Sequence, residues 1–149
     1  AILFALATGF VVMKYVGDTM VTAVRANPMI NSSNASLTGF QAITTASNKL
    51  DYVFFGCFIG LLIGLMVTAW LVSGHPIFMI FYVIAGLIAV FLSFYLSNTY
   101  YTFFTSHFAS LASNFQLTNH IMFNLATYVT VAFAISFIIL FAKPSEERI

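Results

Sequence analysis

The chain has 149 residues, of which 61% are hydrophobic and only 6% are charged, and its formal net charge is +1. A soluble domain carries roughly a quarter of its residues as charges, so this composition excludes an ordinary water-facing surface and indicates a membrane protein. The near-neutral balance predicts neither a nucleic-acid-binding surface nor a polybasic lipid anchor.

The first predicted helix covers residues 2–26. Its uncharged run, residues 1–13, is too short to span a bilayer alone, but Lys14 and Asp18 follow at i,i+4 spacing and can pair on one helix face. We expect a transmembrane helix in which this pair fixes the packing register against neighbouring helices, and we favour that role over catalysis. An interfacial helix is the alternative that the sequence leaves open.

Residues 27–48 are rich in Asn, Ser and Thr and carry no charge, so we interpret them as an exposed polar loop. Residues 52–72 and 77–96 are then two uncharged runs whose lengths, at about 1.5 Å per residue, give roughly the 30 Å of a hydrocarbon core. The short connection between them predicts an antiparallel pair of transmembrane helices.

Small residues recur along one flank of the second predicted helix. Gly56, Gly60 and Gly64 fall four residues apart, and Thr68 continues the series. Helices in lipid associate by close packing at such positions, because the hydrophobic effect gives them little reason to associate. We expect this flank to receive another helix, either the third or the first helix of the chain or a second copy. A pore lining or a ligand groove is the alternative.

Residues 97–120 are uncharged but rich in aromatic side chains. Apolar residues recur there at spacings of 3, 4, 3 and 4 with Thr and Ser on the other faces, a pattern that predicts an amphipathic helix. We expect it to extend the third helix beyond the bilayer or to lie along the headgroups, in contact with the membrane surface or with another protein. The contact residues are Tyr101, Phe104, Phe108, Leu111 and Phe115.

The last predicted transmembrane helix covers residues 121–142. Asn124 and Thr127 lie near one face of it and are expected to form hydrogen bonds across to a neighbouring helix, in preference to forming a substrate site. With this helix, the sequence predicts an all-α integral membrane bundle of four transmembrane helices plus the amphipathic segment, in a single membrane domain.

The sequence offers little for catalysis. The second, third and fourth predicted spans lack the Asp, Glu, Lys, Arg or His that transporters use as relays. His75 is expected at one membrane face and His107 and His120 at the other, so a haem shared between the faces is excluded, and interfacial hydrogen bonding is the favoured role. We therefore predict no enzymatic activity, no cofactor and no metal site.

One stretch, LDYVFFGCFIGLLIGLMVTAWLVSGHPIFMIFYVI, is followed by YLSN at residues 95–98 and by FAKP at residues 141–144. Together these segments resemble small multi-pass membrane proteins of icosahedral bacteriophages that have a lipid bilayer beneath the capsid. The resemblance covers roughly the C-terminal two thirds of the chain and leaves out the first helix and the polar loop. It implies a helical bundle in the virion membrane, present in many copies and touching capsid or vertex proteins, with the host cell membrane as its location during assembly.

Two functions from different classes follow. The first is a structural membrane protein that organises a bilayer by helix packing, with lipids, other copies of the chain and capsid proteins as its partners. The second is an accessory subunit or small channel of a cellular membrane complex, in which the face around Asn124 and Thr127 lines a path. A dry interior favours the first function, whereas a continuous polar track favours the second.

Overall fold

In the computed structural model, residues 1–27, 34–71 and 76–142 are described, and within them every regular element is a helix. The all-α prediction is therefore confirmed. The helices are α1 (Ile2–Arg25), α3 (Asn34–Ser47), α4 (Leu50–Leu71), α5 (Pro76–His107), the 3₁₀ helix η1 (Ala109–Asn114), α6 (Gln116–Phe123) and α7 (Leu125–Ala142).

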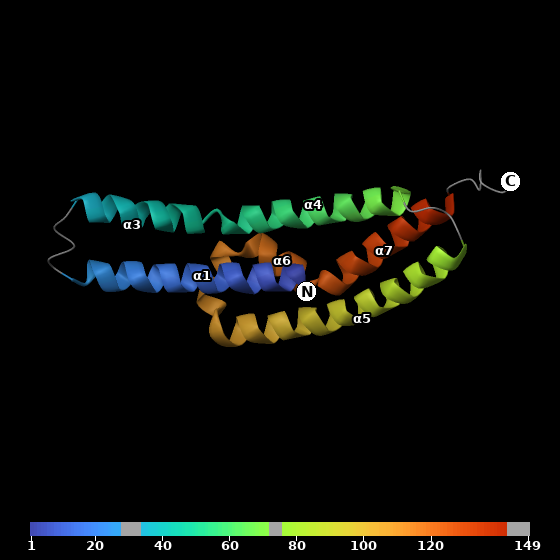
Figure 1. Cartoon of the computed structure of the whole chain (residues 1–149). Helices are drawn as coiled ribbons and strands as arrows, with labels where there is room; N and C mark the ends of the chain where they lie inside the picture. The colour runs from blue at the N-terminus through green and yellow to red at the C-terminus, as the bar shows by residue number, and fades with distance from the viewer. Residues whose placement is uncertain (28–33, 72–75, 143–149) are drawn as a thin grey trace.

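The molecule is elongated (Figure 1). Helices α3 and α4 follow one another almost in line, α1 runs beside α3, and α7 packs along both α4 and α5. The N-terminus lies about midway along the long axis, whereas α4, α5 and α7 all extend to the same far end. The result is two unequal parts: a three-helix part made of α4, α5 and α7, and a two-helix part made of α1 and α3.

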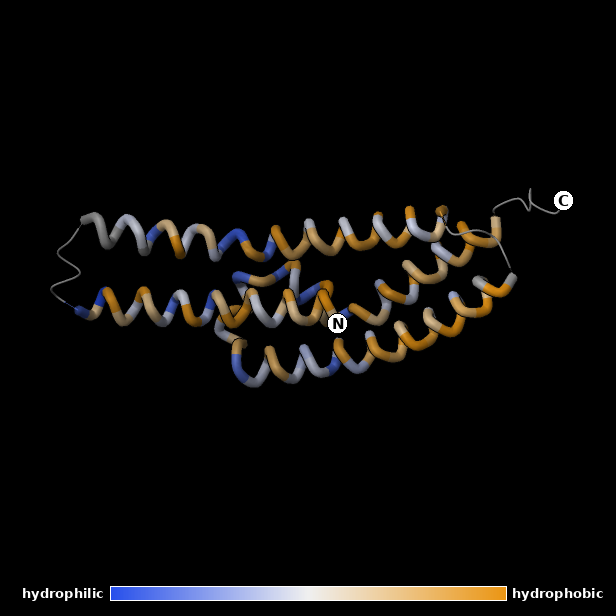
Figure 2. Tube along the Cα trace, viewed as in Figure 1, coloured by the Kyte–Doolittle hydropathy of each residue, from blue (hydrophilic) through white to orange (hydrophobic). Residues whose placement is uncertain are grey.

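Four stretches in the described residues are long and apolar enough to cross a membrane, as the sequence predicted. Figure 2 shows that the most apolar of them occupy the three-helix part, while hydrophilic residues gather in α3, between α3 and α4, and toward the end of α5. The four stretches are Ile2–Arg25, Gln41–Leu71, Met79–His107 and Leu125–Ala142.

The predicted polar loop at residues 27–48 is wrong for most of its length, because Asn34–Ser47 forms α3. Asn, Ser and Thr favour turns in the absence of tertiary contacts, but packing against a neighbouring helix can override that preference. α1 supplies the neighbour: a Cβ atom added at Gly17 would lie 3.9 Å from Cγ2 of Ile43. Gly17 and Ile43 thus face each other where α3 packs against α1.

The other boundaries also depart from the predicted ranges. α5 continues 11 residues beyond Leu96 and ends at His107, so the first part of the predicted amphipathic segment belongs to it. The predicted last helix divides at Asn124, whose backbone angles of φ −108° and ψ 19° separate α6 from α7. In contrast, the first helix matches its predicted range within one residue at its C-terminal end.

Among the described glycines, the one with the most crowded surroundings is one that the sequence analysis did not identify. Gly86 of α5 faces the ring of Phe133 of α7, and a Cβ atom added at Gly86 would clash with three atoms of that ring. The ring is held in place because it stacks on Tyr82, with ring centroids 5.3 Å apart. A glycine is therefore required here for α5 and α7 to approach each other.

We predict that Gly86→Ala destabilises the protein by about 1–3 kcal/mol, because the new methyl group forces the Phe133 ring out of its contact with Tyr82. Thermal unfolding in detergent should show a lower Tm. The matched control is Gly9→Ala in α1, where nothing lies within 4 Å of the added atom; it should leave Tm unchanged or raise it, since Ala is the better helix former. Equal effects of the two substitutions would contradict this account of Gly86.

Candidate functional site

The principal buried polar site lies where α4 meets the start of α6. Asp51 of α4 is only 7% exposed, and its carboxylate accepts hydrogen bonds from two successive backbone N–H groups of α6. Leu117 N donates to Oδ2 at 3.0 Å and Thr118 N donates to Oδ1 at 2.7 Å. The Thr118 hydroxyl also donates to Oδ1, at 2.7 Å. One side chain thus takes up three donors.

This arrangement solves a problem that every buried helix end presents. The first N–H groups of a helix have no intrahelical acceptor, and leaving them unpaired away from water is costly. Asp51 serves as an N-terminal cap supplied from a residue 66 positions away in the sequence. Its negative charge is also favourable at the positive end of the helix dipole, so the acid and α6 stabilise each other.

α5 binds the rest of α6. Tyr100, which is fully buried, donates its hydroxyl to Oδ1 of Asn119 at 2.9 Å. At the C-terminal end, Oγ of Ser97 lies 2.9 Å from the carbonyl oxygens of both Met122 and Phe123, and its single proton is shared between them. We call this set of hydrogen bonds from α4 and α5 to α6 the α6 clamp.

The α6 clamp lies against the hydrophobic core, in which α1, α4, α5, η1, α6 and α7 all take part. Phe54 and Phe115 are fully buried in that core, and Tyr100 stacks on Phe104 with ring centroids 5.8 Å apart. The buried core residues are Ala7, Val11, Phe54, Phe58, Tyr100, Phe104, Phe108, Leu111, Phe115, Ile121, Met122 and Leu125.

A polar cleft of about 290 Å³ borders the clamp on its outer side. Asp51 is part of its lining, and the rest comes from the residue after α3, the start of α4, the end of η1 and the first residue of α6. The cleft is lined by Asn48, Asp51, Tyr52, Ser113, Asn114 and Gln116. Side chains of this kind prefer water to hydrocarbon, which places the cleft, and the clamp behind it, toward the aqueous side of the molecule.

Sequence reasoning did not identify the clamp. Asp51 lies just before the predicted helix of residues 52–72, and the sequence analysis gave it no role. A signal was available, because Asp51 is the only carboxylate between Asp18 and Glu146. Thr118 and Asn119, its neighbours in the fold, lie in a segment that was interpreted as one continuous amphipathic helix.

The ion pair that the sequence predicted is present. Nζ of Lys14 lies 2.8 Å from Oδ1 of Asp18, and the two side chains are 4% and 38% exposed. Lys14 is thus buried within the bundle, while its partner reaches the surface. The proposed role of the pair in fixing register stays a prediction.

The predicted helix-packing flank of α4 is open in the described chain. Nothing lies within 4 Å of a Cβ atom added at Gly56, Gly60 or Gly64, and the hydroxyl of Thr68 donates to the Gly64 carbonyl oxygen at 2.7 Å. At about 100° per residue, Gly60 points away from buried Ala69, nine residues later. Among the described residues, neither the first nor the third predicted helix fills this flank, and its partner stays a prediction.

The predicted interfacial contacts need a correction. Phe104, Phe108, Leu111 and Phe115 are all buried in the chain's own core, and only Tyr101, at 53% exposed, faces outward. The spacing predicted one amphipathic helix through this segment, but α5 ends at His107 and the chain then turns back through η1. The apolar side chains therefore pack against α1, α4 and α6, and not against a membrane surface.

The polar residues of the last predicted helix also differ from expectation. Nδ2 of Asn124 donates to the carbonyl oxygen of His120 at 2.9 Å, which is a bond within its own turn and not one to a neighbouring helix. Thr127 is exposed. Asn124 thus stabilises the break between α6 and α7, a role that follows from its capacity to satisfy backbone groups at helix ends.

The structure describes two of the three histidines. His107 and His120 are both exposed, and His75 lies outside the described residues. Among the residues that the structure describes, no three His, Cys, Asp or Glu side chains are close enough to share a metal ion.

Comparison of the chain with protein-family models, with curated proteins and with solved structures gave no match.

We predict that Asp51→Asn lowers the free energy of unfolding by about 2 kcal/mol, because the new amide offers one acceptor oxygen and turns N–H donors toward N–H donors. Hydrogen–deuterium exchange should show loss of protection at the amides of Leu117 and Thr118. Thr118→Val, which keeps the shape and removes one donor, should cost about 1 kcal/mol and leave the backbone amides protected. Unchanged protection in Asp51→Asn would rule out the cap.

Proposed function

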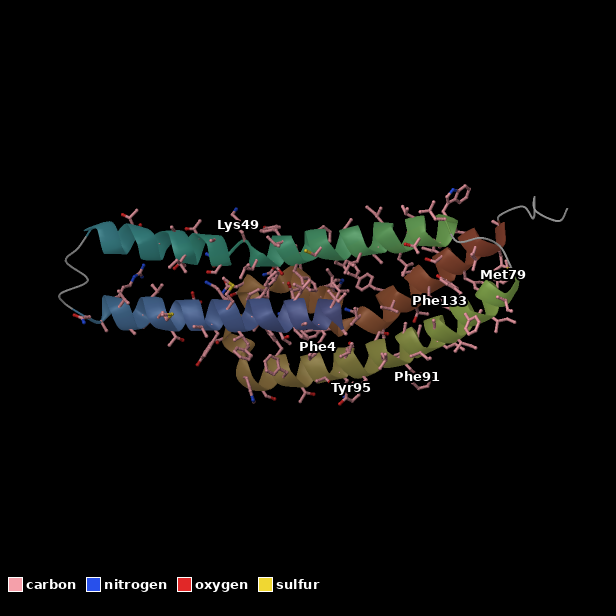
Figure 3. The ribbon with its side chains drawn as sticks, in the orientation of Figure 1. Phe4, Lys49, Met79, Phe91, Tyr95 and Phe133 are labelled. Atoms are coloured by element: carbon pink, nitrogen blue, oxygen red, sulfur yellow. The ribbon has the colours of Figure 1, made fainter. Side chains whose placement is uncertain are left out.

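We propose that this chain is a structural integral membrane protein that organises a lipid bilayer by helix packing. The observation that carries the proposal is the outward direction of its largest apolar side chains in the three-helix part. Phe91 is 81% exposed and points away from the other helices together with Tyr95 (Figure 3). Leu71 and Ile138 are 74% and 66% exposed. So continuous an apolar surface suits lipid or other membrane proteins.

The exterior of α7 favours this function over a channel. Asn124 and Thr127 are exposed near the start of α7, but the residues that continue the same face at helical spacing are Val131, Ile135 and Ile138. A water-filled path needs polar groups or backbone carbonyls along its length. The polar residues here stop within the first turn and a half, so the face suits lipid or apolar packing.

Self-association is the means of organisation that the structure supports. The flank of Gly56, Gly60 and Gly64 is open along α4 and opposite the buried face of that helix. Backbones of two copies can approach closely there, which gains dispersion contacts that larger side chains prevent. Two copies can therefore associate through α4 without any change in the core of either copy.

The setting we propose is the internal membrane of an icosahedral virion, and its support is the sequence resemblance described above. A protein of that kind contacts both the lipid and the protein shell. The end of the molecule formed by α1 and α3 suits the shell contact, because α1 there displays Met13 and Met20, which are 62% and 61% exposed. The second candidate, an accessory subunit of a cellular membrane complex, would use the same surfaces for other subunits.

We predict that Gly60→Leu reduces self-association in an in-membrane dimerisation assay by at least about tenfold, because the side chain keeps the two backbones apart. Leu61→Ala is the control, since Leu61 lies about 100° around the helix from the flank. Its association should match that of the unaltered protein. If Gly60→Leu associates as fully as the unaltered protein, the flank is not the self-association interface.

The proposed setting has its own test. Cryo-electron microscopy of the native particle or membrane assembly should show many copies of the chain in a curved bilayer beneath a protein shell. A few copies arranged around a hydrated path would overturn the structural role and would make Asn124 and Thr127 the next residues to substitute.

A further inference from the structure

We infer that α1 lies outside the bilayer that α4, α5 and α7 cross, so that the chain crosses the membrane three times and α1 and α3 form an arm on one side. The sequence alone predicted four crossings, and length and composition permit four. The inference concerns the placement of the helices along the long axis. It does not depend on the proposed virion setting, since it holds in any bilayer.

The length of α5 is the first observation. Its 32 residues are about 48 Å long, whereas a hydrocarbon core is about 30 Å thick, so roughly 18 Å of α5 leaves the bilayer. The part that leaves is the C-terminal third, because polar residues are concentrated there while the preceding run is apolar. The polar residues are Ser97, Asn98, Thr99, Thr102, Thr105, Ser106 and His107.

The register of α1 against α5 is the second observation. Tyr15 packs edge-on against Phe108, just beyond the end of α5, with ring centroids 5.3 Å apart. Tyr15 therefore lies where α5 has already left the bilayer by most of its excess length. From there α1 continues away from the three-helix part to Arg25, for about another 15 Å, with Gly17 facing Ile43 of α3.

The N-terminal half of α1 fits the same placement. Ala7 and Val11 are fully buried in the core that also contains Phe54 of α4 and Tyr100 of α5. That core adjoins the α6 clamp and the polar cleft, whose polar lining suits the boundary of the bilayer better than its centre. α1 consequently begins near the boundary and extends into the aqueous side, and it does not run back between α5 and α7.

The ion pair is the third observation. Lys14 and Asp18 occupy the middle of α1, where a spanning helix would place them near the centre of the bilayer. Asp18 is 38% exposed, so its carboxylate would then meet lipid, which is unfavourable for a charged group. In the arm, the same carboxylate meets water while the ammonium group of Lys14 stays buried and paired.

The placement makes α1 and the far end of α7 lie on opposite sides of the membrane. α4 crosses away from the arm, α5 returns, and α7 crosses again, which leaves Ala142 on the side opposite α1. Four crossings would place the start of α1 and the end of α7 on the same side.

The test measures the depth of single labelled positions in nanodiscs. Cys57 is the only cysteine of the chain, so Cys57→Ser gives a background into which Met13→Cys or Leu87→Cys is introduced. The two positions are matched, because Met13 and Leu87 are 62% and 57% exposed and lie at the middle of α1 and of the apolar run of α5. Each cysteine carries a bimane fluorophore, and the lipids are brominated near the middle of their acyl chains.

We expect strong quenching of the label at Leu87 and none above the level of unbrominated lipid at Met13. A label at Met20→Cys should behave like the one at Met13, which guards against a local effect of one substitution. Quenching at Met13 equal to that at Leu87 would overturn the inference and restore α1 as a fourth crossing. Because nanodiscs contain no shell and the readout does not require self-association, failure here is distinct from failure of the proposed function.

Discussion

The satisfaction of the backbone groups of α6 is the constraint on which the rest of the fold depends. α6 is only eight residues long, so its unpaired N–H and carbonyl groups form a large share of its backbone, and the helix packs against an aromatic core. Asp51 pairs the first of these groups and Ser97 the last. Since Asp51 belongs to α4 and Ser97 to α5, the same bonds fix how those two long helices meet. α1 then closes the core over this junction.

Because lipid is the solvent, many large apolar side chains of the chain are exposed when it is viewed alone. A soluble protein of this size hides its large apolar side chains, whereas here Phe91, Phe94 and Trp70 face outward. The interior of the three-helix part is correspondingly narrow and relies on small residues such as Gly86, Ala132 and Ser136. Close approach of backbones therefore contributes much of the stability of that part, whereas the buried aromatic side chains gather near the junction with α1 and α6.

The sequence predicted the helices better than it predicted their partners. Apolar runs of the right length located α4, α5 and α7, because a bilayer imposes length and polarity directly on the sequence. The helical fold of α3 was missed because its Asn, Ser and Thr residues indicate a turn unless a neighbour such as α1 is known. Three spaced glycines drew attention to α4, yet Gly86, a lone glycine, makes the tightest contact, since what matters there is the ring of Phe133 on another helix. Asp51 was missed for the same reason: its partners are 66 and 67 residues away.

That separation has a consequence for how the chain is made. During synthesis, Asp51 leaves the ribosome well before Leu117 and Thr118, and the whole α4–α5 hairpin is complete before the carboxylate can meet its native donors. In the interval the charge needs solvation, which the centre of a bilayer does not provide. Its position in the first turn of α4, next to the polar residues Asn48 and Lys49, keeps it near water during that interval. Docking of α6 is then a late step of assembly, in which the hydrated carboxylate of Asp51 exchanges water for the backbone N–H groups of Leu117 and Thr118.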